Sequence, residues 1–300
     1  MTLYKIQLKL KSPLVTSLKG DTIWGHFVWG IANHEGEDAV AKFLEECKSA
    51  NPPLIVSSAF FKGTVCRPLP LPKPHEKMTP DKYADIKKNK KLKSISADKV
   101  FDGKGNADNE GCKFEESSSM HNQINRITNT VLDSEDGEGG GLYSVKELWA
   151  KKENEYDLYI LSSFDAKRIK ELTTWAFENG YGADSSTGKG NIEVISEPLI
   201  VKPAKESNLY MALAPFVVGD FSKIKNLRAD TFIRSGKIGG AFSAYMTPWK
   251  KTVILFDEGA VFESDDKPEY IGQLLTDVHQ DSRICQSGFT PVVPISEDLL

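Results

Sequence analysis

The sequence predicts an α+β fold of tandem ferredoxin-like (RRM-like) domains, with a thumb-like insertion in the first domain. The first observation is period-two alternation of apolar and polar residues, typical of half-buried strands, over residues 4–10 and 155–162. The second is a helical apolar period over residues 21–34 and 165–179. Together they indicate two similar halves separated by a long insertion.

The order of elements follows from two further strand-like stretches, residues 54–61 and 191–196. Without the insertion, the chain reads strand, helix, strand, strand, helix, strand, which is the ferredoxin-like order. Asp21 is predicted as the N-cap of the first helix, and Asp165 begins the second, because a carboxylate accepts from free amides there.

The regular pattern breaks at the proline-rich stretch 67–74, because proline cannot donate to a sheet interior. We therefore predict a first domain of residues 1–74 and 153–198, and an inserted thumb or flexible segment of residues 75–152. Lysines crowd residues 82–99, which we expect to be solvated and mobile. Two extended pieces around the acidic, glycine-rich turn "DSEDGEGGG" predict a hairpin that projects from the body.

Residues 199–300 are predicted to form a second, irregular ferredoxin-like domain. Its expected strands are residues 209–216, 252–256 and 260–262, and a helix is expected over 269–279. A last apolar piece, "FTPVVPI", follows.

Composition limits the function. The formal net charge of −4 does not indicate a nucleic-acid-binding protein, because such proteins usually carry a positive net charge. A site for a polyanion must therefore be a local patch. No apolar run reaches the roughly 20 residues of a membrane span. The four scattered cysteines suggest no metal site and favour a reducing cytoplasm, where we expect the protein to act.

The stretch "GYGADSSTGKG", residues 180–190, carries the strongest local signal. Its glycines expose backbone amides, and a row of amides, hydroxyls and one charge suits phosphate oxygens. The donors are Ser185, Ser186, Thr187 and Lys189. The loop precedes a strand and lacks the spacing of nucleotide-binding motifs, so a nucleotide hydrolase or a dehydrogenase is not indicated. A purely structural turn is the alternative.

An RRM-like half that ends in a G-x-G-x-x-S-S-x-G-K-G loop resembles the RAMP superfamily of CRISPR-associated proteins. The stretches "PLVTSLKGDTIWGHFVWGI", "NPPLIVSSAFF", "HNQINRITNTV", "RSGKIGGAF" and "QSGFTPVVPI" narrow the match. Together they resemble the family of the fourth subunit of the type III-A (Csm) effector complex. The resemblance covers nearly the whole chain and is weakest over residues 75–119.

The resemblance implies a non-catalytic subunit, without cofactor or metal, that binds and caps the 5′ handle of the CRISPR RNA. The partners it implies are that RNA, a large polymerase-like subunit and a backbone RAMP subunit. In the family, the thumb and the glycine loop lie against the RNA. Carried over by position, the contacts fall on Asn122, Arg126, Thr128, Gly182, Ser186, Gly188 and Lys189.

In an extended strand, Asn122, Arg126 and Thr128 would share one side. The alternative for this stretch is a solvated hairpin without RNA. The loop also departs from the family, since relatives often have Gly-Asp-Arg where this chain has Ala183, Asp184 and Ser185. The contact of the missing guanidinium would then pass to Lys189 or Arg234.

Three more cations are candidates for RNA or partner contact. Lys19 precedes the first helix, whose N-terminal amides attract anions, although it could equally be an ordinary surface lysine. Arg234 and Lys237 lie in or beside the glycine-flanked turn "RSGKIGG".

His26 raises the alternative of a metal-independent CRISPR-RNA-processing endoribonuclease, since histidine is a common general acid or base. Such catalysis needs a partner group, and no other histidine pairs with His26 by spacing. A packed or interface histidine is therefore preferred. A third alternative is a structural subunit whose glycine loop touches only protein.

Overall fold

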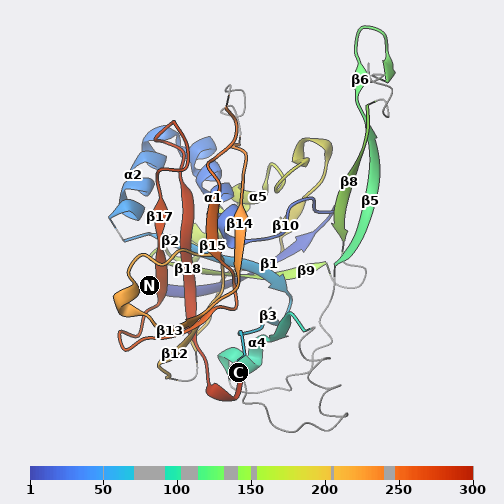
Figure 1. The fold of residues 1–300 in the computed structure, drawn as a ribbon. Coiled ribbons are helices and arrows are strands. Elements are labelled where there is room, and N and C mark those ends of the chain that lie inside the picture. The colour runs from blue at the N-terminus through green and yellow to red at the C-terminus, as the bar shows by residue number, and fades with distance from the viewer. Residues whose placement is uncertain are drawn as a thin grey trace, which may run out of the picture.

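The computed structural model shows a mixed α+β chain whose body contains two five-stranded antiparallel sheets, and a two-stranded hairpin projects from that body (Figure 1). The structure describes residues 1–49, 51–70, 92–102, 114–131, 141–149, 154–203, 206–239 and 247–299. The acidic turn predicted over residues 133–141, except for Gly141, and most of the lysine-rich segment lie outside these ranges.

The first sheet has the strand order β10-β1-β9-β2, and each neighbouring pair is antiparallel. Its strands are β1 (Thr2–Leu10), β2 (Leu54–Phe61), β9 (Glu155–Ser162) and β10 (Ile192–Val194), with β11 (Leu199–Ile200) also paired to β1. The helices are α1 (Gly20–Glu35), α2 (Glu37–Lys48) and α5 (Ala166–Phe177). The predicted order of elements in the first half is therefore confirmed.

The core of this half lies between the sheet and the helices. Alternate residues of β1, including Ile6 and Leu8, are fully buried against α1 and α5. The two helices approach closely at Gly30, where a Cβ would lie 2.9 Å from that of Trp175. Close packing thus explains a helical glycine that helix propensity alone disfavours.

The two helix starts differ from each other. Asp165 caps α5 as predicted, because its carboxylate accepts from the Arg168 amide at 2.8 Å. The prediction for Asp21 is wrong, since α1 begins at Gly20 after Lys19 and Asp21 is buried in the first turn. Its carboxylate binds Arg234 instead of a helix amide.

The second sheet has the order β13-β16-β12-β18-β17. Its strands are β12 (Leu209–Ala212), β13 (Lys225–Arg228), β16 (Val261–Glu263), β17 (Tyr270–Leu275) and β18 (Gln286–Pro294). A separate hairpin is formed by β14 (Thr231–Arg234) and β15 (Val253–Phe256). None of the residues described after 198 forms an α-helix, so a second ferredoxin-like unit is not confirmed.

The helix predicted over residues 269–279 is wrong, because β17 occupies most of that stretch. Its apolar residues recur at a spacing that fits a helix, but the strand pairs along its whole length with β18. At Gly272 the backbone has φ +111°, and a Cβ would lie 2.0 Å from the Gly288 carbonyl oxygen. Cross-strand contact therefore overrides the local pattern.

The insertion contributes to the body as well as to the projection. After β3 (Thr64–Cys66), the strand β4 (Ser94–Ser96) and the short helix α4 (Ala97–Phe101) pack against the second sheet. Ile95, Val100 and Phe101 are buried there. The described end of the lysine-rich segment is thus folded, which differs from the solvated segment predicted.

The projecting hairpin, here called the thumb, comprises residues 115–131 and 142–149. It contains β5 (Glu115–Asn122) paired with β8 (Leu142–Trp149), and at its tip β6 (Ile124–Asn125) paired with β7 (Thr130–Val131). Figure 1 shows the thumb standing clear of the sheets. The predicted projection is therefore present.

Candidate functional site

Residues 12–17, which follow β1, hold the glycine loop of residues 180–190 in place. The Pro13 carbonyl accepts from the Gly190 amide at 2.8 Å, and the Thr16 hydroxyl accepts from the Ala183 amide at 3.0 Å. The Tyr181 hydroxyl donates to the Ser17 carbonyl at 2.7 Å. The loop is thus fixed against this segment at both of its ends.

The same short segment also pairs with the base of the thumb. Leu14 and Leu148 of β8 exchange two backbone hydrogen bonds, at 3.0 and 2.7 Å. Residues 12–17 therefore contact the glycine loop and the thumb together. The glycine loop and the base of the thumb therefore lie next to each other, whereas the predicted thumb contacts lie further out.

Glycine is needed in the loop for two reasons. The backbone has positive φ at Gly180, Gly182, Gly188 and Gly190, and also at Asp184. At Gly182 a Cβ would in addition lie 2.5 Å from the Cβ of Thr16. The predicted use of glycine for unusual backbone conformations is therefore confirmed.

The outer side of the loop is polar and open. Ser186, Thr187 and Gly188 are exposed, while Tyr181 and Gly190 are buried beneath them. The Thr187 hydroxyl donates to the Asp184 carbonyl at 2.9 Å. Within the described residues, neither the Ser185 nor the Ser186 hydroxyl has a hydrogen-bond partner. This surface therefore offers unused hydroxyl donors to a ligand.

Lys189 connects the loop to the thumb. Its Nζ lies 2.6 Å from Oε1 of Glu147 in β8, and the Ser119 hydroxyl of β5 donates to the same oxygen. Lys189 and Ser119 hold the pKa of Glu147 below its usual range, so the carboxylate is ionised. Lys189 is thus already neutralised within the chain.

The three predicted thumb residues lie further out. β5 ends at Asn122, and residues 126–129 form a tight turn that brings Asn129 to a φ of +55°. The prediction that Asn122, Arg126 and Thr128 share one strand face is therefore wrong. From Glu147 to Leu142, the partner of Asn122, the thumb extends about 17 Å.

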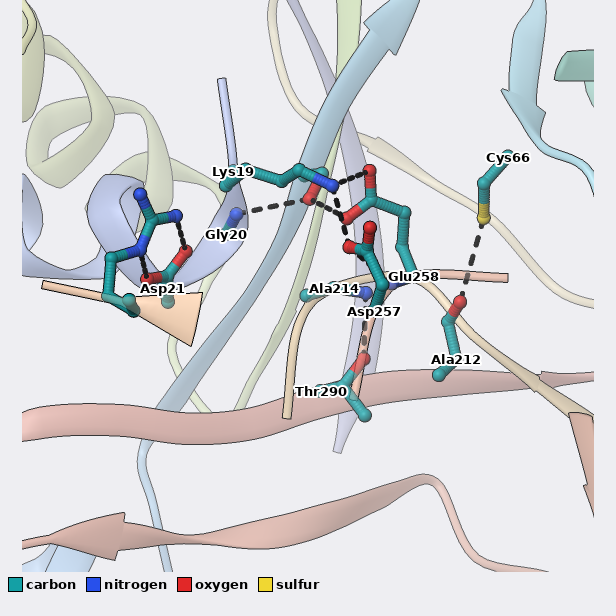
Figure 2. Close-up of polar contacts among 11 residues, drawn as sticks. Lys19, Gly20, Asp21, Cys66, Ala212, Ala214, Asp257, Glu258 and Thr290 are labelled. Carbon is teal, nitrogen blue, oxygen red and sulfur yellow. Dashed lines mark hydrogen bonds and ion pairs between the residues drawn. The ribbon is translucent and has the colours of Figure 1, made fainter. Parts of the chain in front are cut away.

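Lys19 and Arg234 belong to a charged network that joins the two halves of the chain. Figure 2 shows the Lys19 ammonium between Asp257 and Glu258, each at 2.6 Å. Burial raises the pKa of Glu258 to about 7. The nearby Lys19 ammonium lowers this pKa, but by less than burial raises it.

Arg234 forms a two-pronged pair with Asp21, at 2.7 and 2.9 Å. Both Lys19 and Arg234 thus have intrachain partners, and their contact with RNA stays a prediction. Lys237 is exposed, and its Nζ lies 4.5 Å from the ring centre of Trp249.

His26 is packed beneath the glycine loop. Its Nε2 accepts from the Gly182 amide at 3.2 Å, the ring also hydrogen-bonds the backbone of Ala176, and the ring of Tyr181 lies 4.9 Å away. Burial lowers its pKa to about 4, so the imidazole is neutral. His26 therefore supports the loop, in agreement with the preferred packed histidine.

Sequence reasoning missed Thr16, Ser119 and Glu147. Their contacts join residues that are 28 to 167 positions apart, so no local period predicts them, although Thr16 lies within the quoted stretch "PLVTSLKGDTIWGHFVWGI". His121, the first residue of the stretch "HNQINRITNTV", stacks on Tyr143 across the thumb, and no spacing in the sequence predicts this contact.

Within the described ranges, no group of three or more potential metal ligands occurs, and no helix is long and apolar enough to cross a bilayer. The fold and the site thus define a class: an α+β chain with a glycine loop seated against a projecting two-stranded thumb.

Comparison with known proteins specifies this class further. No family model and no curated protein match the chain. A chain of the crystal structure of the Csm1-Csm4 cassette in complex with AMPPNP aligns with a TM-score of 0.61 over 98% of both chains, at 14% identity. A chain of the Csm3-Csm4 subcomplex of the type III-A CRISPR-Cas interference complex aligns with a TM-score of 0.53 over 99% of this chain and 100% of that chain, also at 14% identity. The resemblance predicted from the sequence is thus confirmed at the level of the fold.

Proposed function

We propose that this chain is a non-catalytic RNA-binding subunit of a type III-A CRISPR ribonucleoprotein. It binds and caps the 5′ handle of the CRISPR RNA, and it anchors the large polymerase-like subunit beside a backbone RAMP subunit. The observation that carries the proposal is the seating of the glycine loop and the thumb on one segment, residues 12–17. The likeness in fold to chains of Csm1-Csm4 and Csm3-Csm4 assemblies supports the choice of partners.

The proposed mechanism is binding by shape and by polar contacts. Single-stranded RNA is held through its phosphates, its 2′-hydroxyls and its unpaired bases. The open hydroxyls of Ser185 and Ser186 and the exposed Gly188 would contact the backbone, and Arg126 and Thr128 at the thumb tip would contact nucleotides further along. Lys237 extends this surface if the RNA reaches the β14–β15 hairpin.

The test is the affinity of the purified full chain for fluorescent single-stranded repeat RNA, measured by anisotropy at several salt concentrations. Loss of one phosphate contact lowers the salt slope by about 0.7 for a single strand. We expect this change for Arg126→Ala, with weaker binding. The control is Lys223→Ala, which removes an exposed lysine beside the second sheet and should change neither quantity.

Two results would overturn the proposal. If the wild-type chain, alone and with its partner subunits, has no more affinity for repeat RNA than for an unrelated strand, handle binding is wrong. If the chain cleaves repeat RNA in the presence of a chelator and His26→Ala abolishes the cleavage, the nuclease alternative is correct.

A further inference from the structure

The two faces of the thumb differ in chemistry. In a strand pair, side chains at paired positions lie on the same face. One face carries the exposed apolar residues Met120 and Leu142, with exposed fractions of 66% and 58%, beside the polar residues Asn122, Ser144 and Lys146. The other face carries Ser119, His121 and Tyr143, together with Glu147, which binds Lys189 of the glycine loop. The face that carries the paired rings of His121 and Tyr143 is therefore the one joined to the loop.

His121 and Tyr143 form a stacked pair on this loop-side face. They are directly opposite each other on β5 and β8, their ring centroids lie 5.6 Å apart, and their planes differ by 25°. Tyr143 is 53% exposed, so its ring is open to a further stacking partner. A phenol that sits half in solvent on a hairpin without a core of its own gains little from folding.

A chain of hydrogen bonds fixes the orientation of the imidazole. The Ser119 hydroxyl has one proton, which it donates to the ionised Glu147, and its oxygen lies 2.9 Å from Nε2 of His121. Nε2 must therefore be the nitrogen that carries hydrogen and donates to Ser119. In the neutral ring, Nδ1 is left as an acceptor. The relay from Lys189 through Glu147 and Ser119 thus sets the position and the tautomer of His121.

We propose that the His121–Tyr143 pair is a stacking site for one unpaired nucleobase of the bound strand, a role that rests on the proposed function. Base stacking on aromatic rings is a general means of holding single-stranded nucleic acid, and it tolerates any base. His121 Nδ1 adds an acceptor for an amino or imino hydrogen at the base edge. A protein partner would instead gain most from the opposite face, where Met120 and Leu142 are exposed.

The test combines protein variants with abasic scanning of the RNA. The probe is fluorescent single-stranded repeat RNA in which one nucleotide at a time lacks its base but keeps its phosphate. For the wild-type full chain, we expect one abasic position to weaken binding about tenfold, in line with one stacked base. For Tyr143→Ala, affinity for intact RNA should fall by a similar factor, and that abasic position should cost nothing more.

Three further variants make the result specific. Tyr143→Phe keeps the ring and should retain both the affinity and the abasic effect. Met120→Ala truncates an exposed side chain on the opposite face and should leave both unchanged. His121→Ala should reduce the abasic effect in part, since it removes the second ring of the platform.

The outcomes separate this inference from the proposed function. If the wild-type chain binds repeat RNA but no abasic position loses its effect in Tyr143→Ala, the stacking site is wrong while handle binding stands. The same holds if Tyr143→Ala weakens only the copurification of partner subunits. If the wild-type chain binds no repeat RNA specifically, the proposed function fails first.

Discussion

Lys189 has two possible roles, as a contact for an RNA phosphate or as an ion pair that positions the loop against the thumb. A lysine in a glycine loop predicts a phosphate contact, but here Nζ lies 2.6 Å from Glu147 and the side chain is only 21% exposed. Because it bridges the loop and the thumb, we interpret it as a positioning residue. In the alternative, Lys189 leaves Glu147 and binds a phosphate when RNA is bound. Removing the charge of Glu147 would then strengthen RNA binding instead of weakening it.

We therefore predict that Lys189→Met and Glu147→Gln weaken repeat-RNA binding by similar factors, and that the double variant is no weaker than either single variant. Residues that act as one pair are not additive. The salt slope should stay unchanged, because no phosphate contact is lost. The measurement is anisotropy on the four proteins. Tighter binding by Glu147→Gln would show that Glu147 competes with phosphate for Lys189.

His26 predicts a pH dependence of the loop. Its folded-state pKa of about 4 lies below the usual value, so the unfolded chain binds the extra proton more readily. Its contribution to stability is therefore present above about pH 6.5 and is lost as the pH falls toward 4. For this half-buried ring we expect a loss of about 2 kcal/mol over that window.

The measurement is the free energy of unfolding of the wild type minus that of His26→Gln, taken at several pH values between 7 and 4. Because both proteins contain Glu258, its contribution cancels in this difference. Glu258, with its raised pKa, acts in the opposite direction over a similar range. A difference that stays constant with pH would contradict the assignment.

At the scale of elements, the glycine loop depends on its seat against residues 12–17. We predict that Gly182→Ala destabilises the chain and weakens RNA binding more than Gly188→Ala. Both positions have positive φ, but only at Gly182 would the Cβ also meet Thr16, whereas open space surrounds Gly188. Both variants share a backbone strain of about 1 kcal/mol. The difference in their free energies of unfolding therefore measures the clash between the new Cβ at position 182 and Thr16. If Gly182→Ala and Gly188→Ala had equal effects on thermal unfolding and on RNA binding by anisotropy, the role of this contact would be contradicted.

The elements of the first half could be predicted because their signals are local. Alternation in the sequence marks β1 and β9, although β9 is buried on both faces instead of one, and an apolar period marks α1 and α5. The wrong predictions arise where a contact with a residue far along the chain determines the local structure. β17 is a strand because β18 pairs with it, and Asp21 is not a cap because Arg234 binds it.

The candidate site follows the same rule. Its two parts, the glycine loop and the thumb, carry sequence signals of their own. Leu14 and Thr16 also lie in a quoted stretch, but nothing in the sequence predicts where they meet the loop and the thumb. Their contacts and that of Glu147 are long-range and follow no local period.

For the whole molecule, charged contacts hold the second half against the first helix. Arg234 of β14 binds Asp21, whose side chain is fully buried and also accepts from Gln286 at 3.0 Å. We predict that Arg234→Met lowers the free energy of unfolding by about 3 kcal/mol, since it leaves a buried carboxylate without its cation. Asp21→Asn combined with Arg234→Met should recover part of this loss. If Arg234→Met instead weakens RNA binding without a change in stability, Arg234 is an RNA contact.

The central claim is that the glycine loop and the thumb form one surface for a single RNA strand. The most direct measurement is photo-crosslinking of repeat RNA that carries 4-thiouridine at successive positions, with the crosslinked peptides identified by mass spectrometry. We predict that nearby nucleotides of one strand crosslink to residues 183–188 and to residues 117–128. Bound RNA that crosslinks to only one of these segments, or to neither, would contradict the claim.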